Sequence, residues 1–346
     1  MASILTVILN WRTPEMTLRS AQAALREMAG LDGALVIVDN DSGDGSFERM
    51  THAVRGWGDN LVRVLQSGRN GGFGAGNNFG IRAGMPDGSK PDYIYILNSD
   101  AFPDKGAIGA LLHHLEAHPH TGFAGSQLHG PDGEAHRTAF QFPTIASEFE
   151  TQIRLGLVSR ILHRSVVAQA LPTITSRVDW LAGASLMMRQ TVLDRIGLFD
   201  ERFFLYFEET ELCLRAARAG YTVDYVVESQ VEHIGSVSTG MREWTRIPQF
   251  WLDSRLHYFT KSHGRAYAVA ATVAHIAGGV FWRARLLVQR KDPGDPPRPG
   301  SHHRIWRWAL CQRHYDGGCA RVRPARSPPR RSDRDRGRQL HHSGRT

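Results

Sequence analysis

The 346-residue sequence has few of the features that mark secreted or membrane-spanning proteins. Its three cysteines, Cys213, Cys311 and Cys319, form no C-x-x-C pair and are too few for a disulfide framework, which favours a reducing compartment. No window approaches the roughly 20 uninterrupted apolar residues of a membrane span. The first residues contain no basic region and no small-residue cleavage site. We therefore expect a cytoplasmic protein.

Positive charge is scarce outside the C-terminal end. The formal net charge of the chain is +8, yet residues 301–346 alone contain twelve arginines, no lysine and three aspartates, a net +9. The remainder is nearly neutral, which argues against a nucleic-acid-binding surface on the main domain. From residue 292 the chain is rich in Arg, Pro, His and Ser, so residues 292–346 are predicted to be a basic tail with little stable structure.

Short β-branched runs alternate with helix-length segments in the first hundred residues. The runs lie at residues 4–9, 34–38, 62–66 and 93–97, and a helix is expected from about residue 13 to residue 28. Continuous apolar runs of this length are typical of strands that are buried on both faces. The pattern predicts an α/β fold with a doubly wound, mostly parallel sheet flanked by helices. Ligands of such sheets lie beyond the carboxyl ends of the strands.

Polar residues follow the first two runs. Asp39 comes after the second run, and its carboxylate there can accept a hydrogen bond from a pyrimidine ring N–H. Asn10 follows the first run and is expected to lie alongside Asp39. The structural alternative is that Asp39 and Asn40 only form an Asx-turn.

The fourth run ends in Asn98-Ser99-Asp100. Two polar side chains spaced by one residue lie on the same side of an extended backbone. Because hard divalent cations prefer oxygen ligands and bridge to substrate phosphates, Asp100 is a candidate ligand for Mg²⁺ or Mn²⁺. The neutral Asn98 suits ribose better. The alternative is a capped turn before Pro103.

A glycine-rich segment runs from Asn70 to Asn78. It matches neither a dinucleotide-binding fingerprint nor a Walker loop, because no Lys-Ser or Lys-Thr follows it. Its glycines would let the backbone approach a ligand, and Arg69 or the asparagine side chains could meet phosphate or ribose. As an isolated motif this segment is weak.

The acidic cluster Glu208, Glu209 and Glu211 follows the aromatic run at residues 203–207 and precedes a helix start at residues 212–215. Acids are favoured at helix N-termini, which is the structural alternative. Three carboxylates set against aromatic side chains are costly, however, unless their charge is used. A carboxylate in this cluster could act as a general base. His233 ends a further hydrophobic strand; a lone histidine is commonly a core or surface residue, but this strand is expected to neighbour the site.

Two other stretches complete the organisation of the chain. Residues 140–178 give weak signals and are expected to form a mobile flap. The pattern is helical from about residue 250 to residue 289. Residues 263–291 are predicted to be an amphipathic helical extension with a basic-aromatic end.

Taken together, these segments resemble the inverting GT-A glycosyltransferases of family 2, and especially their bacterial rhamnosyltransferase-like branch. The resemblance covers residues 3–262, so residues 1–262 are expected to form the catalytic domain. It rests on Leu9-Asn10-Trp11, residues 38–46, residues 70–78, Leu97-Asn98-Ser99-Asp100, residues 180–184, residues 199–204 with the acidic cluster, His233, Ser236, Ser254-Arg255 and Tyr258-Phe259.

The resemblance implies a role for each matching residue. It places Asp39 on the nucleotide base, Asn98-Ser99-Asp100 in the position of the family's D-x-D, and His233 with Asp100 as a metal or diphosphate contact. The family's acidic pair matches Glu208-Glu209, and Glu209 stands where the family usually has an aspartate base. The asparagine at position 98 removes one charge from the metal site. The longer glutamate at position 209 leaves Glu208, Glu209 and Glu211 all as candidates for the base. The implied nucleotide-sugar contacts are Asn10, Asp39, Asn70, Asn78, Asn98, Asp100, Trp180 and Gly183.

The resemblance also implies the reaction. The processive-synthase signature Q-x-x-R-W is absent, so transfer of a single sugar is expected. The implied donor is a nucleoside-diphosphate sugar, with dTDP-rhamnose as the leading candidate, and the implied acceptor is a lipid-linked or cell-surface glycan precursor. A basic, aromatic C-terminal region fits peripheral contact with the anionic inner face of the plasma membrane. Two alternatives from other classes are a non-catalytic sugar-nucleotide-binding protein and a nucleic-acid-binding protein that acts through the Arg-rich tail.

Overall fold

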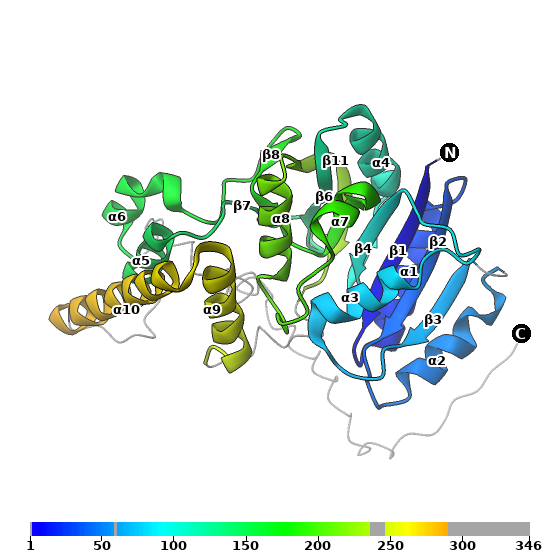
Figure 1. Ribbon diagram of the computed structural model, residues 1–346, viewed down its shortest axis with the longest axis horizontal. Coiled ribbons are helices and arrows are strands. Elements are labelled where there is room, and N and C mark those ends of the chain that lie inside the picture. The colour runs from blue at the N-terminus through cyan, green and yellow to red at the C-terminus, as the bar shows by residue number, and fades with distance from the viewer. Residues whose placement is uncertain (1, 59–60, 236–245, 290–346) are drawn as a thin grey trace, which may run out of the picture. The chain divides into compact units, whose positions relative to one another are not determined.

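The structure is a computed structural model of the whole chain and describes residues 2–58, 61–235 and 246–289 (Figure 1). The predicted basic tail at residues 292–346 lies outside the described residues, as do Cys311, Cys319 and Ser236. Cys213, within them, is buried and makes no disulfide. Among the described helices, none is long and apolar enough to cross a lipid bilayer.

Strands and helices alternate along most of the described chain. In the first hundred residues they are β1 (Ser3–Asn10), α1 (Pro14–Glu27), β2 (Asp32–Asp39), α2 (Ser46–Ala53), β3 (Val62–Gln66), α3 (Gly72–Arg82) and β4 (Tyr93–Asn98). There follow β5 (Ala101–Pro103), α4 (Ala107–Ala117), β6 (Thr121–His129), β7 (Ala139–Phe140), α5 (Ile145–Ile153), α6 (Gly156–Ile161), β8 (Ser176–Val178), β9 (Trp180–Leu181), β10 (Ser185–Arg189), α7 (Gln190–Ile196), α8 (Glu208–Arg218), β11 (Thr222–His233), α9 (Gln249–His263) and α10 (Arg265–Val288). Short 3₁₀ turns lie at Val54–Gly56 and His163–Ser165.

Within the described residues, a nine-stranded sheet organises the fold. Its order is β3-β2-β1-β4-β10-β6-β11-β5, and β8 pairs with β11 outside this path. The strands β1 to β4 are mutually parallel, and β6 is parallel to β11. The strand β10 is antiparallel to both β4 and β6, so β6 and β11 run in the same direction as the first four strands. The predicted α/β fold with a mostly parallel sheet is confirmed.

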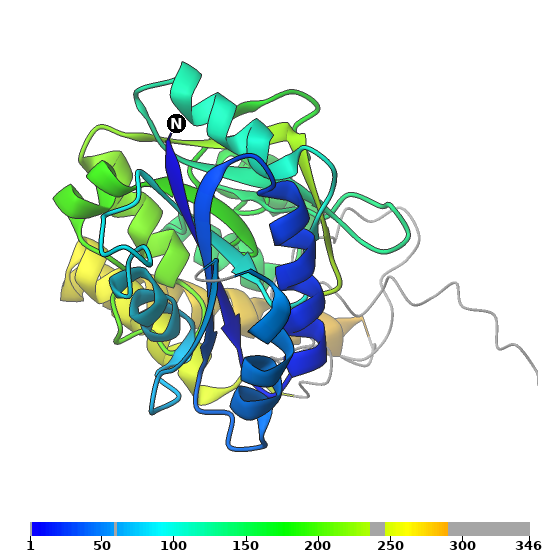
Figure 2. The same cartoon turned by 90° about the vertical axis from the view of Figure 1, so that its right-hand side faces the viewer.

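Both faces of the sheet are covered, which explains the continuous apolar runs. In β1, Leu5 and Val7 face one buried cluster, while Ile4 and Ile8 face a second cluster on the opposite side. The first cluster takes residues from α3, α7 and α8, and the second takes residues from α1, α2 and α4. Figure 2 shows β1 with α1 and α2 on one side of the sheet. A strand buried on both faces needs apolar residues at every position.

The carboxyl ends of the four parallel strands gather polar side chains at one edge. Asn10 pairs in register with Asp39, Asp39 pairs with Gln66, and Asn98 lies opposite Leu9. The chain moves outward from β1 to β3 and returns to β4 on the other side of β1. Reversals of this kind are where open α/β sheets bind ligands.

A third apolar cluster joins α9 and α10 to the segment before α8. Phe203 and Phe207 share it with Tyr258 of α9 and with Ala268 and Ala271 of α10. The helical pattern expected from residue 250 to residue 289 is present as two helices, which are separated at Gly264 with φ +90°. The division into a catalytic domain at residues 1–262 and an extension at residues 263–291 stays a prediction.

Two segments that gave no clear secondary-structure signal contain helices. Residues 72–82, within and after the glycine-rich segment, form α3, whose glycines allow close packing, Gly76 against Leu9 and Gly80 against Val7. Residues 140–178 contain α5, which has a capping box at Thr144, and α6; the mobile flap expected there stays a prediction. Both α3 and α5 pack against residues that are distant in the sequence.

Candidate active site

Asp39 lies at the end of β2 in a buried hydrogen-bond network. Asn10 Nδ2 donates to Asp39 Oδ1 over 2.7 Å, and Ser42 Oγ donates to the same oxygen over 2.7 Å. The Ser42 backbone N–H donates to Asp39 Oδ2 over 3.1 Å. Asp39 therefore accepts hydrogen bonds from the turn that follows it, as in the structural alternative, and Asn10 lies alongside Asp39 as expected. The network orients the carboxylate, which is 1% exposed, at the end of the strand.

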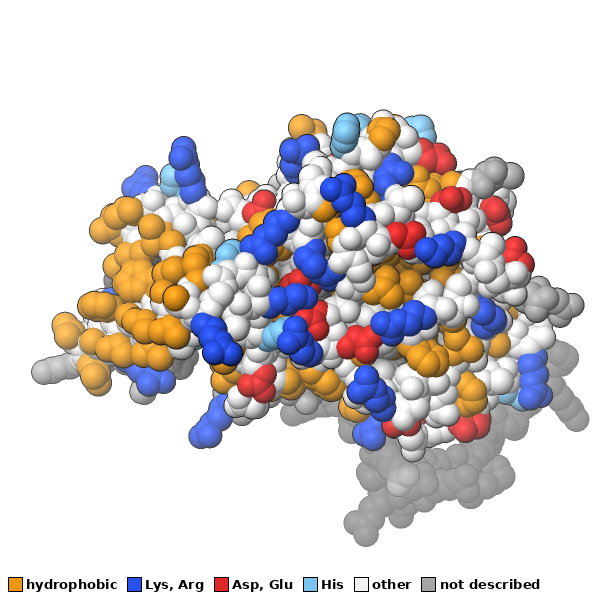
Figure 3. Space-filling model, viewed as in Figure 1, with side chains coloured by type: hydrophobic (Ala, Val, Ile, Leu, Met, Phe, Trp, Pro, Cys, Tyr) orange, Lys and Arg blue, Asp and Glu red, His pale blue; other side chains and the backbone are white. Residues whose placement is uncertain are grey.

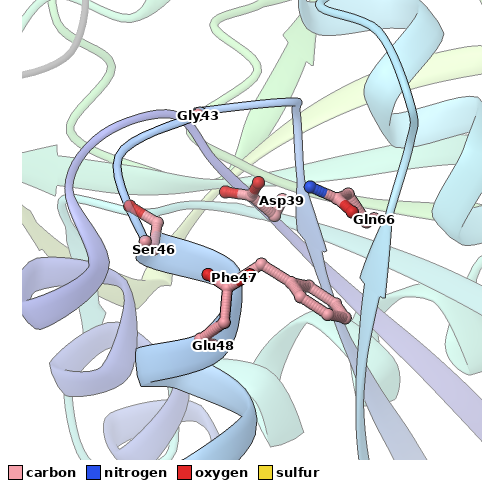
Figure 4. A pocket seen from close by; sticks show the side chains of 7 residues that line it. Asp39, Gly43, Ser46, Phe47, Glu48 and Gln66 are labelled. Carbon is pink, nitrogen blue, oxygen red and sulfur yellow. The ribbon is translucent and has the colours of Figure 1, made fainter.

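A pocket of about 390 Å³ opens beside this network (Figure 4). Its lining residues are Asp39, Gly43, Gly45, Ser46, Phe47, Glu48 and Gln66. Figure 4 shows the Asp39 carboxylate and the Gln66 amide next to each other, with the Phe47 ring below them. A carboxylate, an amide and an aromatic face in one pocket can pair with the edge of a planar heterocycle and stack on it.

The two asparagines of the glycine-rich segment have different surroundings. Asn70 Oδ1 accepts hydrogen bonds from Asn40 Nδ2 at 3.0 Å and from the Gly72 backbone at 3.1 Å. Asn78 is fully buried, donating to the Phe199 carbonyl at 2.9 Å and accepting from the Phe199 N–H at 3.1 Å. Asn70 thus lies near the carboxyl edge of β2, whereas Asn78 holds the chain at residue 199.

Asp100 and His233 form a donor pair near the end of β4. The His233 Nε2 and Asp100 Oδ1 atoms are 3.2 Å apart, and Asn98 Nδ2 is 3.5 Å from the same His233 nitrogen. The antiparallel pairing of β11 with β5 produces this proximity, since His233 lies opposite Ala101. Within the described residues, no group of three or more His, Cys, Asp or Glu side chains could hold a metal ion.

Glu208 and Glu209 open α8 and are both buried, at 2% and 7% exposure. The acidic cluster lies inside the first turn of the helix, four residues earlier than the expected helix start. Within the described part of the chain, Glu208 Oε2 and Glu209 Oε2 have no hydrogen-bond partner. Burial raises the pKa of Glu209 to about 7, and burial together with the neighbouring Glu209 raises the pKa of Glu208.

The backbone around this acidic pair is held from two sides. The Gly183 N–H donates to the Glu209 carboxylate. The Phe73 N–H at the start of α3 donates to the Phe204 carbonyl over 2.9 Å. Tyr206 and Phe207 both have positive φ, 71° and 70°, which is costly for residues with bulky side chains. Strained backbone of this kind persists only where its surroundings over-determine it.

Glu211 differs from its two neighbours. Its Oε1 atom lies 2.8 Å from Arg215 Nε and 2.8 Å from Lys261 Nζ. Arg215 also donates to the Leu198 carbonyl over 2.7 Å. The charge of Glu211 is therefore compensated within a network that ties α8 to α9 and to the preceding loop.

Hydrogen bonds connect the separate parts of the site. Thr13 Oγ1 is 3.5 Å from both Asn10 Oδ1 and Ser99 Oγ, which links the network at Asp39 to the residue before Asp100. On the other side, the Asn98 N–H donates to the Ala184 carbonyl over 2.9 Å, one residue beyond Gly183. The pocket, the donor pair and the acidic pair thus border a common region at the end of the sheet.

The other expected residues are also placed. Gly183 lies against Phe73 and contacts Glu209, as described. Trp180 lies in the core, stacks on Phe140 at 4.3 Å and donates to the Gln141 carbonyl over 2.9 Å. The nucleotide-sugar roles of Trp180 and Asn78 stay predictions, since both side chains are engaged within the protein.

Three residues of this region were not among the predicted site residues. Gln66 is the last residue of β3, and Ser42 and Phe47 follow β2. Gln66 could have been found by applying the strand-end argument to the third run as well. Phe47 carries no comparable signal, because an aromatic residue in the first turn of an amphipathic helix is ordinary.

The chain is similar to known glycosyltransferases. Residues 3–169 match the family described as "Glycosyl transferase family 2". An N-acetylglucosaminyl-diphospho-decaprenol L-rhamnosyltransferase of Mycobacterium tuberculosis is 29% identical over 249 residues, which are 69% of this chain and 79% of the relative. Rhamnosyltransferase WbbL of Escherichia coli is 27% identical over 160 residues, 45% of this chain and 58% of that protein.

A solved structure supports the fold assignment. The crystal structure of GalNAc-T7 with UDP, GalNAc and Mn²⁺ superposes with a TM-score of 0.53 at 12% sequence identity. The match covers 84% of this chain and 58% of the other. At this identity the likeness concerns the fold alone.

Proposed function

Because this chain is a family 2 glycosyltransferase, we propose that it transfers one rhamnosyl group, with inversion, from dTDP-rhamnose to a lipid-linked glycan acceptor. The rhamnosyltransferases among its relatives support the choice of sugar. The M. tuberculosis relative is named for an acceptor that carries N-acetylglucosamine diphosphate on decaprenol, which supports an acceptor of this class.

The observation that carries the proposal is the buried acidic pair at the start of α8. A general base is most effective when its pKa lies near the operating pH. The pKa of Glu209 is raised by burial to about 7, and one of its carboxylate oxygens lacks a partner among the described residues. Glu211 is already paired with Arg215 and Lys261. We therefore assign the base to Glu209.

The proposed reaction is a single displacement at the anomeric carbon. Glu209 accepts the proton of the acceptor hydroxyl while the hydroxyl oxygen forms the new bond to the anomeric carbon of the sugar. The bond from the anomeric carbon to the diphosphate breaks, and the nucleoside diphosphate leaves with the bonding electrons. The Gly183 N–H contacts the Glu209 carboxylate, and the carbonyl of the next residue, Ala184, accepts from the Asn98 N–H at the end of β4.

The nucleotide is proposed to bind along the carboxyl ends of β1 to β4. Asp39 accepts from the pyrimidine N–H, Phe47 stacks on the base, and Gln66 contacts its edge. Asn98 contacts the ribose. The second oxygen of Asp39 and the amide of Gln66 give the pocket both an acceptor and a donor.

Asp100 and His233 fit a divalent cation. Asp100 Oδ1 and His233 Nε2, 3.2 Å apart, offer two metal ligands. Mg²⁺ is usually bound by few protein ligands together with substrate phosphates. When bound, Mg²⁺ or Mn²⁺ would supply positive charge against the diphosphate. Asp100 and His233 would also orient that diphosphate at the end of β4.

A donor screen tests the proposal. The purified protein is incubated with dTDP-rhamnose, UDP-galactose, UDP-glucose or GDP-mannose, and with N-acetylglucosamine diphosphate on a short alkyl chain. We expect a rhamnosylated product from dTDP-rhamnose alone, with the anomeric configuration opposite to that of the donor. Transfer of another sugar in preference, or a product of retained configuration, would contradict the proposal.

A further inference from the structure

The outer face of α10 is almost entirely apolar. Its exposed side chains repeat at helical spacing, with 59–63% exposure at the four central positions: Val269, Val273, Ile276 and Val280. Phe281, Leu287 and Val288 continue this face at 60–85% exposure. A helix on the solvent-exposed surface of a globular protein normally has polar side chains on its outward face. An apolar helix face of this extent marks an interaction site.

The opposite face of α10 is already occupied by α5. A Cβ atom at Gly278 would lie 2.7 Å from Gln152 Cβ and from the Phe149 carbonyl, so the two helices are in close contact. Phe281, although 60% exposed, also meets Phe149 of α5 edge to face at 6.2 Å. The His275 Nδ1 atom lies 2.7 Å from Glu148 Oε2. The outward face of α10 therefore cannot turn inward without breaking this packing.

The short helix α6, which follows α5, extends the apolar surface. Leu157 and Ile161 of α6 are 64% and 69% exposed. Figure 3 shows apolar side chains gathered over α6 and α10 in the same view. We call the exposed residues Leu157, Ile161, Val269, Val273, Ile276, Val280, Phe281, Leu287 and Val288 the α6/α10 surface.

The charges bordering this surface have one sign. Exposed arginines lie at both ends of α10, Arg265 and Arg283, and in or after α6, Arg160 and Arg164. Residues 145–165 and 265–288, all described, contain two carboxylates, and both are buried: Glu148 pairs with Arg255, and Glu150 is 2% exposed. The surface thus presents apolar side chains and positive charge without an exposed acid.

We propose that the α6/α10 surface docks on an anionic lipid bilayer, with α10 lying in the plane of the interface. Apolar side chains enter the boundary between headgroups and acyl chains while arginines contact the headgroups, as in interfacial amphipathic helices. A second copy of the chain fits less well, because a two-fold contact would set these arginines against their own counterparts without compensating carboxylates. The inference rests on the proposed function only in that a lipid-linked acceptor requires access to a membrane.

Vesicle binding by the full chain tests this surface. The triple variant Val273→Ser/Ile276→Ser/Val280→Ser removes three apolar side chains that are already mostly exposed. Its matched control, Leu61→Ser/Phe79→Ser, changes exposed apolar residues just before β3 and in α3, at 37% and 39% exposure. Sedimentation is measured with phosphatidylcholine vesicles that contain about a quarter phosphatidylglycerol. The triple variant is expected to bind about 100-fold more weakly than the wild type, and the control to bind like the wild type.

Charge is tested with a second pair of variants. Arg160→Gln/Arg283→Gln is expected to weaken binding to the anionic vesicles about tenfold, whereas Arg26→Gln/Arg55→Gln, which changes exposed arginines elsewhere, leaves it unchanged. At about 0.5 M salt the Debye length is only about 4 Å. Wild-type binding that survives there and is lost in the triple variant comes from the apolar face, not from the charge of the C-terminal tail.

Several results would overturn the docking proposal. The proposal is wrong if the triple variant binds vesicles as well as the wild type does. It is also wrong if the control variant loses as much vesicle binding as the triple variant. Complete loss of wild-type binding at high salt would assign binding to charge alone. A wild-type dimer that the triple variant converts to monomer, without vesicle binding by either, would show that a second copy covers the surface. All variants are also assayed with the short-chain acceptor, where unchanged turnover separates this question from the proposed reaction.

Discussion

Gly72 at the start of α3 lies so close to Phe204 that a Cβ atom at position 72 would overlap the Phe204 carbonyl. Gly72 also has φ +86°, a conformation that side chains other than glycine disfavour. The carbonyl of Phe204 accepts the Phe73 N–H, and residues 206 and 207 then enter α8 with positive φ. The glycine-rich segment therefore acts on the acidic pair through the backbone, by positioning the loop that carries Glu208 and Glu209.

Gly72→Ala should displace this loop. We expect a loss of about 2 kcal/mol or more in the free energy of unfolding, together with a fall in kcat larger than the rise in KM for donor. The matched control is Gly109→Ala in α4, where a Cβ meets nothing within 4 Å and helix propensity improves. Denaturant unfolding and steady-state kinetics measure both variants. Wild-type kcat in a folded Gly72→Ala protein would refute this positioning role.

Glu209→Gln should leave the affinity for the nucleoside diphosphate nearly unchanged and lower kcat about 100-fold or more, because it removes proton acceptance while preserving shape. Glu211→Gln is the comparison, since it breaks contacts with Arg215 and Lys261 and should mainly lower stability. Calorimetric titration with dTDP and single-turnover transfer measure binding and chemistry separately. The base assignment is wrong if Glu209→Gln turns over normally while Glu211→Gln is inactive.

The pH dependence of transfer should report the buried pair. The base must be ionised, so kcat/KM should rise with pH through an apparent pKa near 7, the value to which burial raises Glu209. Because the charge of Glu209 raises the pKa of Glu208, Glu208 stays protonated while Glu209 ionises, so Glu208→Gln should leave the rising limb near pH 7. Profiles of kcat/KM from about pH 5 to pH 9 test both statements. A limb that moves to lower pH in Glu208→Gln would show that Glu208, and not Glu209, ionises first.

Asp100→Ala should abolish the part of donor affinity that depends on a divalent cation, and His233→Ala should weaken it. The reason is that these side chains offer the two protein donors, 3.2 Å apart, at the end of β4. Binding of dTDP is measured by thermal shift with Mn²⁺ and with excess chelator, using Asp104→Ala as a control at an exposed carboxylate nearby. Full wild-type activity in excess chelator would be incompatible with a metal at this position.

The four parallel strands could be predicted from the sequence because burial on both faces demands apolar residues at consecutive positions. This local demand also located Asn10, Asp39 and Asn98, since polar residues can begin only where the buried strand ends. The same reasoning applied to β3 would have reached Gln66.

Tertiary contacts decided what local pattern could not. The glycines of residues 72–80 favour no helix by themselves, and they form α3 because Leu9, Val7 and Phe204 approach too closely for any side chain. Glu208, Glu209 and Glu211 look alike in sequence, but Lys261 from α9 and Arg215 reach only Glu211, while burial leaves the other two with raised pKa values. In α10, apolar residues lie on every side of the helix, and α5 and α9 together cover only part of them. The physical reason is common to all three cases: a side chain's charge state and exposure depend on neighbours that the fold brings from distant parts of the chain.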